Sequence, residues 1–211
     1  MDLEAARALT AEVTSASLCD AMAKLHAHRC HAIGLVPARP GTVTAGFAAT
    51  IRFGPRRDDL PDHDLAAAAE RAIADIPAGA LVVISGPDAP DEAVAGGKKL
   101  AALEEMGAVG VIAWAAIRDR DEAAGYEMGV WSLHETPRAS GDRLQVIEVG
   151  GLITFGGITV APGDWVHVDG AGMVVVPAAD RDEVLEAAVQ IEEADAATVA
   201  DIRRRGRQSR A

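Results

Sequence analysis

The sequence predicts a single α/β domain that contains a parallel crossover unit. Two short, wholly apolar segments, 81–84 and 109–114, are typical of strands buried on both faces of a sheet. A helix that begins at Gly96 and Gly97 separates them, and a strand, a helix and a second strand in this order form a parallel pair. The length of 211 residues and the hydrophobic content of 49% suit one domain with a sizeable core.

The N-terminal part predicts two helices and then a strand. Apolar residues recur near the helical period from Leu3 to Leu25, and the polar residues in the middle of this stretch divide it. Either Ser15 or Ser17 would cap the second helix, because a serine hydroxyl accepts a bond from a free amide of the first turn. The segment 42–53 alternates small and apolar residues and predicts a strand.

Two further helices are predicted before and after the first apolar strand. Leu65, Ala69, Ala72 and Ile76 mark one apolar face of a helix that ends before Gly79. The helix that begins at Gly96 and Gly97 reaches Met106 and ends at Gly107.

The last third of the chain predicts short strands and one long helix. Glycine and proline turns separate the strands, which we expect at 144–149, 152–155, 158–160, 165–168 and 173–176. Asp180 can cap the helix, with Glu183 at the capping-box position. We therefore expect one domain over 1–211, with N-terminal helices at 1–25, an α/β core at 42–177 and a C-terminal helix at 180–205 that packs on a neighbouring subunit.

The charge and the composition exclude several classes of protein. The formal net charge of −12 repels a phosphate backbone, and the one basic run (Arg203, Arg204, Arg205, Arg207 and Arg210) is interpreted as a solvated tail. No apolar stretch reaches the length of a membrane span, and the two cysteines without a secretory signal indicate a reducing compartment. We expect a cytoplasmic protein that binds neither nucleic acid nor membranes.

One segment combines groups that bind anions and metals. Gly96 and Gly97 expose backbone N–H groups at a helix start, which suits a carboxylate or a phosphate. Arg118 and Asp119 follow a buried strand, so they should lie at the edge of the sheet where ligands collect. The guanidinium can bind a carboxylate and the aspartate a divalent metal. Alternatively, the pair closes a surface loop.

A second group of metal-binding residue types has a simpler interpretation. His26, His28, Cys30 and His31 are close in sequence, but their spacing does not match a helix face or a regular metal motif. We interpret this group as a surface turn.

Several segments together resemble the RraA-like family. The central signature runs from Gly96-Gly97-Lys98-Lys99 through Met106-Gly107-Ala108-Val109-Gly110 to Arg118-Asp119. Ser15 to Met22, with Asp20, resembles the N-terminal helix motif of the family. Gly46 to Thr50 fits an early strand, and Pro162 to Val166 and Gly172 to Pro177 fit the late segments. The match is spread over most of the chain in the right order.

The resemblance implies a fold, an assembly and an activity. The family has a swivelling β/β/α fold and assembles as trimers or hexamers with active sites between subunits. Its aldolase members use Mg²⁺ or Mn²⁺ to cleave 4-hydroxy-2-oxo acids, or to decarboxylate oxaloacetate, through a pyruvate enolate. The resemblance implies that Arg118 binds the substrate, that Asp119 holds the metal, and that the amides of Gly97, Lys98 and Lys99 bind the substrate carboxylate. It also makes Glu193 and Asp195 candidates that reach a neighbour's site.

This chain departs from the aldolase pattern at three positions. Gly97 stands where the aldolases commonly have an aspartate that supports the metal, which puts the metal in doubt. Trp114, followed by Ala115, stands where an Asp-Gly pair is usual, and we expect it to narrow the pocket; Ala171 replaces a usual acid. The alternative function is a non-catalytic regulator that binds ribonuclease E. A methyltransferase is not favoured, because no nucleotide-binding Gly-x-Gly-x-x-Gly follows a strand.

Overall fold

A mixed β-sheet forms the centre of the molecule. The computed structural model describes residues 1–208 except 62–63, 77, 88–90 and 142, so Arg210 of the basic tail lies outside the described residues. The sheet has the strand order β1-β12-β11-β3-β4-β6-β7-β2, with β5 added beside β6 and β8 beside β3. Its strands are β1 (His31–Ala32), β2 (Val36–Pro37), β3 (Thr44–Pro55), β4 (Ala80–Ser85), β5 (Ala93–Ala95), β6 (Gly110–Ile117), β7 (Gly129–Glu135), β8 (Leu144–Val149), β11 (Trp165–Asp169) and β12 (Gly172–Val176).

The parallel crossover that the sequence predicts is present. Strands β3, β4, β6 and β7 are parallel, and Val82 of β4 pairs with Val111 of β6. Every residue of β4 is buried, as its continuous apolar sequence requires. Helix α4 (Gly97–Glu105) lies between β4 and β6 in the chain. The predicted mixed α/β architecture is confirmed.

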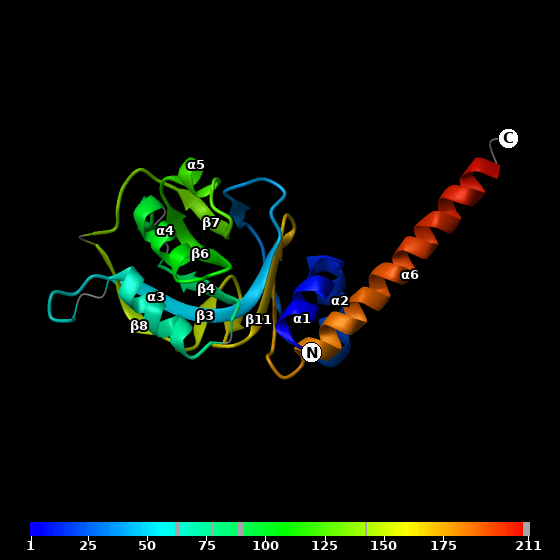
Figure 1. Cartoon of the computed structure of the whole chain (residues 1–211), viewed down its shortest axis with the longest axis horizontal. Coiled ribbons are helices and arrows are strands. Elements are labelled where there is room, and N and C mark those ends of the chain that lie inside the picture. Colours follow the sequence, from blue (N-terminus) through cyan, green and yellow to red (C-terminus); the bar gives the residue numbers. More distant parts are fainter. Residues whose placement is uncertain (62–63, 77, 88–90, 142, 209–211) are drawn as a thin grey trace.

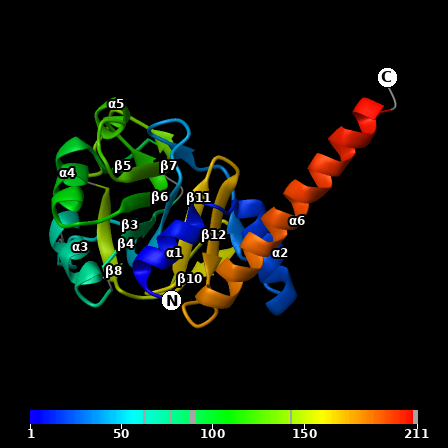
Figure 2. The same ribbon diagram turned by 45° about the vertical axis from the view of Figure 1, so that its right-hand side comes forward.

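Each face of the sheet is covered by a different layer. Helices α3 (Leu65–Ala74) and α4 lie side by side over one face (Figure 2), where Leu100 and Leu103 pack with Val82 and Val111. A small antiparallel pair, β9 (Ile153–Phe155) and β10 (Ile158–Val160), packs against the other face. Since successive side chains of a strand point to opposite faces, the side chains of β6 point either toward α4 or toward the β9–β10 pair.

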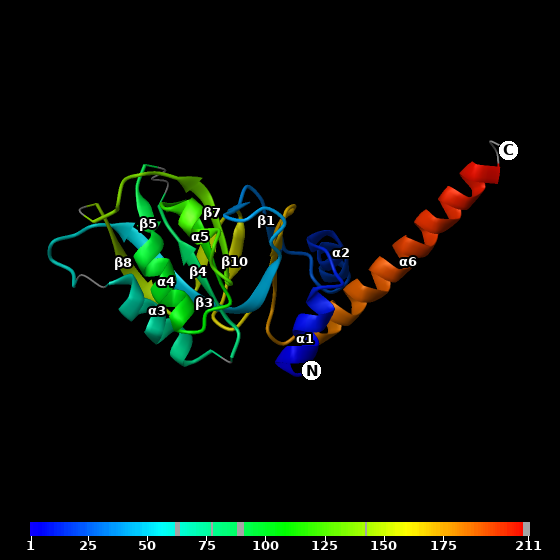
Figure 3. The same cartoon turned by 45° about the horizontal axis from the view of Figure 1, so that its top comes forward.

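The N-terminal helices pack against the antiparallel end of the sheet, where α2 contacts β11 and β12. Helices α1 (Leu3–Thr10) and α2 (Ser15–Leu25) lie between the body and helix α6 (Arg181–Gln208) in Figure 3. Neither Ser15 nor Ser17 is the N-cap of α2. Thr14 is the cap, and the Ser17 hydroxyl accepts from the Thr14 amide to complete a capping box. The helix therefore begins at Ser15, one residue earlier than a Ser15 cap would give.

Helix α6 projects from the body (Figure 1). Its first turns are anchored by Val184, Leu185 and Ala188, which are buried, whereas Ile202 is 64% exposed. The Asp180 carboxylate, which was expected to cap this helix, instead lies 2.9 Å from Nε2 of His26. None of the helices within the described ranges combines enough length with enough apolar sequence to cross a bilayer.

Candidate functional site

Two chain segments meet at the carboxyl ends of β5 and β6. These strands are parallel, with Ala95 paired to Ile117, and the Arg118 amide donates to the Ala95 carbonyl at 3.0 Å. The next residues are therefore neighbours: Gly96 and Gly97 begin α4, and Arg118 and Asp119 precede the short helix α5 (Arg120–Ala123). The structure brings the two halves of the predicted site together.

Asp119 has an unusual backbone conformation, and its carboxylate accepts a hydrogen bond from α4. Its φ of 61° and ψ of 40° are left-handed, and among the described residues it is the one non-glycine residue with a positive φ. Such a conformation costs about 1–2 kcal/mol for most residues and less for aspartate. Oδ2 of Asp119 accepts a bond from the Gly97 amide at 2.9 Å. The turn therefore positions a carboxylate at the positive end of α4.

Gly96 leaves the space in which the Arg118 side chain lies. A Cβ atom at residue 96 would stand 2.5 Å from Cγ and 2.6 Å from Nε of Arg118, and 2.9 Å from Oδ2 of Asp119. The Arg118 guanidinium stays close to Asp119, with Nε 3.5 Å from Oδ2, and remains 42% exposed. A cation that is held at one end and open to solvent can still bind an incoming carboxylate.

A second carboxylate, that of Glu122, lies in the site and was not predicted from the sequence. A Cβ atom at Gly97 would collide with the Glu122 carboxylate, so this group fills the space where a side chain at residue 97 would lie. The signal was present: Glu122 follows Asp119 by three residues, which is one turn of α5. Glu122 thus brings a second carboxylate from α5 to the start of α4.

Tyr126 orients Glu122. Its hydroxyl lies 3.0 Å from Oε1 of Glu122 and 3.0 Å from the Gly97 carbonyl oxygen, both of which accept hydrogen bonds. Burial and then the bond to Glu122 raise the pKa of Tyr126 to about 12. The phenol therefore remains a proton donor at neutral pH and holds the Glu122 carboxylate beside α4.

A small cavity of about 250 Å³ lies beside Arg118 and the start of α4. Gly96, Lys98, Lys99 and Arg118 line it, together with Ala93, Val94, Ala95, Ala139, Ser140 and Gly141. Lys98 is exposed and Lys99 is half-buried. The cavity therefore offers positive charge to an anionic ligand of a few heavy atoms.

The backbone amides differ from what the resemblance implied. The Gly97 amide is already bound to Asp119, and the Lys99 amide donates to the Gly96 carbonyl at 2.9 Å. Of the three amides expected to bind a substrate carboxylate, that of Lys98 alone has no acceptor among the described residues.

Trp114, Glu193 and Asp195 do not join this group in the single chain. The Trp114 ring stacks on Phe155 with centroids 5.0 Å apart, so it points into the layer of β9 and β10, on the face away from α4. Its expected role in narrowing the pocket is not supported by this position, because successive side chains of a strand alternate between faces. Glu193 and Asp195 are exposed on the projecting part of α6.

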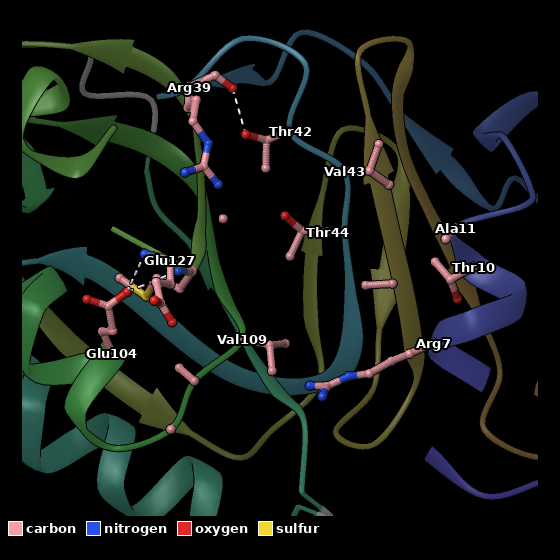
Figure 4. A pocket seen from close by; sticks show the side chains of 15 residues that line it. Arg7, Thr10, Ala11, Arg39, Thr42, Val43, Thr44, Glu104, Val109 and Glu127 are labelled. Carbon is pink, nitrogen blue, oxygen red and sulfur yellow. Dashed lines mark hydrogen bonds between the residues drawn. The ribbon is translucent and has the colours of Figure 1, made fainter. Parts of the chain in front are cut away.

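A larger cavity lies elsewhere, near the amino ends of the central strands. It measures about 530 Å³, and Figure 4 shows Arg7, Arg39, Glu104 and Glu127 around it. Oε1 of Glu104 accepts hydrogen bonds from the amides of Glu127 and Met128, so this carboxylate stabilises the loop before β7. Ligands of parallel sheets collect at the opposite ends of the strands. We therefore place the candidate site at Gly97, Arg118, Asp119 and Glu122.

Known proteins match this chain in sequence and in fold. The family model described as "RraA-like: Aldolase/RraA" matches residues 15–175. A protein of Pseudomonas paraeruginosa named "Putative 4-hydroxy-4-methyl-2-oxoglutarate aldolase" is 31% identical over 101 residues, which are 48% of this chain and 62% of that protein. The match thus spans about three fifths of that relative. A protein of the same name from Alkalilimnicola ehrlichii is 31% identical over 130 residues, or 61% of this chain and 80% of the relative.

A solved structure agrees over nearly the whole chain. RraAS2 of Streptomyces coelicolor, described as an unusual member of the RNase ES inhibitor RraA protein family, gives a TM-score of 0.83 at 24% identity. The likeness covers 95% of this chain and 98% of that chain, and at this identity it shows the fold alone.

Proposed function

Because the chain belongs to the RraA-like family, which its model matches over residues 15–175, we propose that it is a divalent-metal-dependent carbon–carbon lyase that acts on a small 2-oxo acid. The observation that carries this proposal is the pair of carboxylates at the start of α4. Asp119 is bound to the Gly97 amide, and Glu122 fills the space over Gly97. The aldolases commonly have an aspartate at residue 97. This chain has glycine there, so without Glu122 the site would offer a metal the Asp119 carboxylate alone.

The donor set fits a hard divalent cation. Mg²⁺ is usually bound by one or two carboxylates and keeps several waters, and Mn²⁺ prefers the same oxygen ligands. Asp119 is 44% exposed and Glu122 is also exposed, so waters can complete a coordination shell beside them. Asp119 and Glu122 would hold the ion, and Tyr126 would keep Glu122 in place.

The remaining side chains suit the binding of a 2-oxo acid. Arg118, with its guanidinium open to solvent, would bind the substrate carboxylate, while Lys98 and Lys99 add positive charge to the cavity wall. A bound Mg²⁺ or Mn²⁺ supplies Lewis-acid polarisation of the 2-oxo group, which stabilises the negative charge that develops as the carbon–carbon bond breaks. The cavity of about 250 Å³ selects a substrate of a few carbon atoms.

A protein-binding role is the second function. The family model covers aldolases and RraA proteins alike, and RraAS2 of Streptomyces coelicolor is described as a relative of ribonuclease inhibitors. The net charge of −12 would suit a basic partner segment. The hydrogen bonds among Asp119, Gly97, Glu122 and Tyr126 favour the enzyme, because a binding surface does not require two oriented carboxylates at a helix start.

The test is the release of pyruvate from oxaloacetate and from 4-hydroxy-4-methyl-2-oxoglutarate. We expect release with Mg²⁺ or Mn²⁺ that a chelator abolishes. Asp119→Asn should reduce kcat/KM by about 100-fold or more, because asparagine tolerates the left-handed backbone but cannot supply the negative charge. Arg118→Ala should raise KM, because it removes the carboxylate-binding cation.

Matched controls separate these effects from general ones. Asp121→Asn makes the same change in charge at an exposed neighbour of Asp119 and should retain activity. Arg57→Ala removes an exposed arginine paired with Asp59 and should also retain it. Metal-independent release, or equal activity in Asp119→Asn and wild type, would contradict the proposal.

A further inference from the structure

The two cysteines of the chain lie together with a histidine, far from Asp119 in the fold. Cys19 is on α2, Cys30 precedes β1, and His31 is the first residue of β1. Their two sulfur atoms and one imidazole nitrogen all lie within 4.8 Å of one another, and this is the one such group of three or more among the described residues. Ten residues lie between the two cysteines in sequence, so the fold, and not a local motif, brings them together.

Backbone bonds fix this cluster. The Cys30 carbonyl accepts from the Val175 amide at 2.8 Å, and His31 pairs with Val174 in the sheet. Cys30 is buried, with 8% exposure, in the core cluster that joins α2 to β12. The interpretation of this segment as a surface turn is therefore wrong for Cys30 and His31. Side chains held by a sheet edge and a capped helix are pre-organised for a ligand.

The neighbouring histidines do not belong to the cluster. Nε2 of His26 lies 2.9 Å from the Asp180 carboxylate, and the His26 and His28 rings face each other with centroids 4.9 Å apart. They therefore provide controls of the same residue type close by in the sequence.

We propose that Cys19, Cys30 and His31 bind Zn²⁺. Two thiolates and an imidazole are ligands that zinc prefers, whereas Mg²⁺ and Mn²⁺ prefer carboxylate oxygens such as those of Asp119. Tetrahedral zinc with bonds of about 2.0–2.3 Å places its ligand atoms roughly 3.5–3.8 Å apart. Since the three atoms already lie within 4.8 Å, rotation of side chains closes the remaining gap.

The fourth position of this site is open. A cavity of about 180 Å³ adjoins Cys19 and His31, and Ser15, Ile33 and Met173 form part of its wall. Three protein ligands and one exchangeable position are typical of zinc sites that hold a water molecule. Binding would release the thiol protons to solvent and would join α2 to the sheet edge, so zinc should also stabilise the fold.

Cobalt substitution tests the site without reference to activity. Reduced protein, freed of metal with a chelator, is titrated with Co²⁺ and then with Zn²⁺. We expect one ion per chain, a sulfur-to-cobalt charge-transfer band, the visible bands of tetrahedral Co²⁺, their loss on adding Zn²⁺, and a higher Tm with Zn²⁺. Cys19→Ser, Cys30→Ser and His31→Asn should each weaken Zn²⁺ binding by about 100-fold or more.

Control variants separate this site from the proposed active site. His28→Asn and Asp119→Asn should keep the cobalt spectrum and the affinity for Zn²⁺, because neither removes a ligand of the cluster. Circular dichroism in the presence of chelator checks that the serine variants are folded. The proposal is overturned if reduced, folded wild type binds no Zn²⁺, or if its affinity for Zn²⁺ equals that of Cys19→Ser. A cobalt spectrum that lacks the sulfur band also overturns it, even if pyruvate release at Asp119 is metal-dependent.

Discussion

At the scale of single residues, one glycine explains the arrangement of the candidate site. Gly97 leaves room for the Glu122 carboxylate, and its amide binds Asp119. A side chain at residue 97 and the present position of Glu122 exclude each other. Where the resemblance implies an aspartate at residue 97, we propose that the Glu122 carboxylate from α5 takes its place.

The single tyrosine of the chain reports directly on this arrangement. Tyr126 is the one tyrosine in the sequence, so the tyrosinate absorbance in a pH titration belongs to it alone. Burial and the bond to Glu122 raise its pKa to about 12, and we expect the midpoint there. In Glu122→Gln the midpoint should fall toward the usual value of about 10, because the negative neighbour is gone.

The same shift has a defined effect on stability. The folded pKa of Tyr126 is raised, so its contribution to the free energy of unfolding is complete below about pH 10 and is lost as the pH rises toward about 12. Asp121→Asn, which neutralises an exposed acid of α5, should leave the midpoint of the Tyr126 titration unchanged. A wild-type midpoint at the usual value would mean that Tyr126 does not contact Glu122.

At the scale of elements, the start of α2 is tied to the turn between β11 and β12. The Asp169 carboxylate accepts bonds from the Ser15 amide at 2.8 Å, the Ser15 hydroxyl at 2.7 Å and the Ala171 amide at 2.9 Å. Burial opposes its charge, but these donors and His167 outweigh burial and hold the pKa of Asp169 well below its usual value. The carboxylate therefore links the N-terminal helices to the sheet.

Asp169→Asn should lower the free energy of unfolding by roughly 2–3 kcal/mol at pH 7, because an amide is a weaker acceptor for these donors. The difference from wild type should shrink as the pH falls below about 4, since a carboxyl with a depressed folded pKa stabilises the fold only while it is ionised. Urea unfolding at several pH values measures both effects. Glu193→Gln, at an exposed position, is the control, and an equal loss in that variant would contradict this assignment.

Elements with a clear pattern were predicted, including the short strands β9 and β10, and elements without one were missed. The wholly apolar strand 81–84 corresponds to β4, and the glycine pair at residues 96–97 marks the start of α4. Strand β7 was missed, because Gly129–Glu135 neither alternates nor is continuously apolar. Helix α5 has four residues, too few for a periodic pattern.

The candidate site was predicted in part for a related reason. Arg118 and Asp119 could be placed at a strand end from the sequence, because β6 is strongly apolar. Glu122 depends on the short helix α5, and the pairing of Cys19 with His31 depends on how α2 packs against β12. Contacts of this kind are set by tertiary packing, which local patterns do not encode.

At the scale of the whole molecule, α6 indicates assembly. Ile191 still packs against the core and Glu192 still accepts bonds from Thr14, but residues 193–200 are all exposed, and Val199 and Ile202 are 44% and 64% exposed. A helix with apolar residues in water and no packing along its length is marginally stable. We therefore expect the wild-type chain of 21.8 kDa to form a homo-oligomer in which α6 packs on a neighbour. The resemblance to the RraA-like family implies that this assembly is a trimer or a hexamer.

Light scattering coupled to gel filtration measures the mass of this assembly. The double variant Val199→Asp with Ile202→Asp should reduce the mass, because two charges cannot be buried in an apolar interface. The matched control, Glu193→Gln with Asp195→Asn, changes two exposed acids on the same helix and should retain the mass. A monomeric wild type would contradict this role of α6.

The central claim is that the Glu122 carboxylate serves the metal site in place of a side chain at residue 97. The most direct measurement is metal-dependent pyruvate release, with Mn²⁺ binding measured in parallel, in wild type, Glu122→Ala and the double variant Gly97→Asp with Glu122→Ala. We expect Glu122→Ala to lose both activity and Mn²⁺ binding, and the double variant to regain both, because Asp at residue 97 fills the space that Glu122 has left. Full activity in Glu122→Ala, or a double variant no better than the single one, would contradict the account.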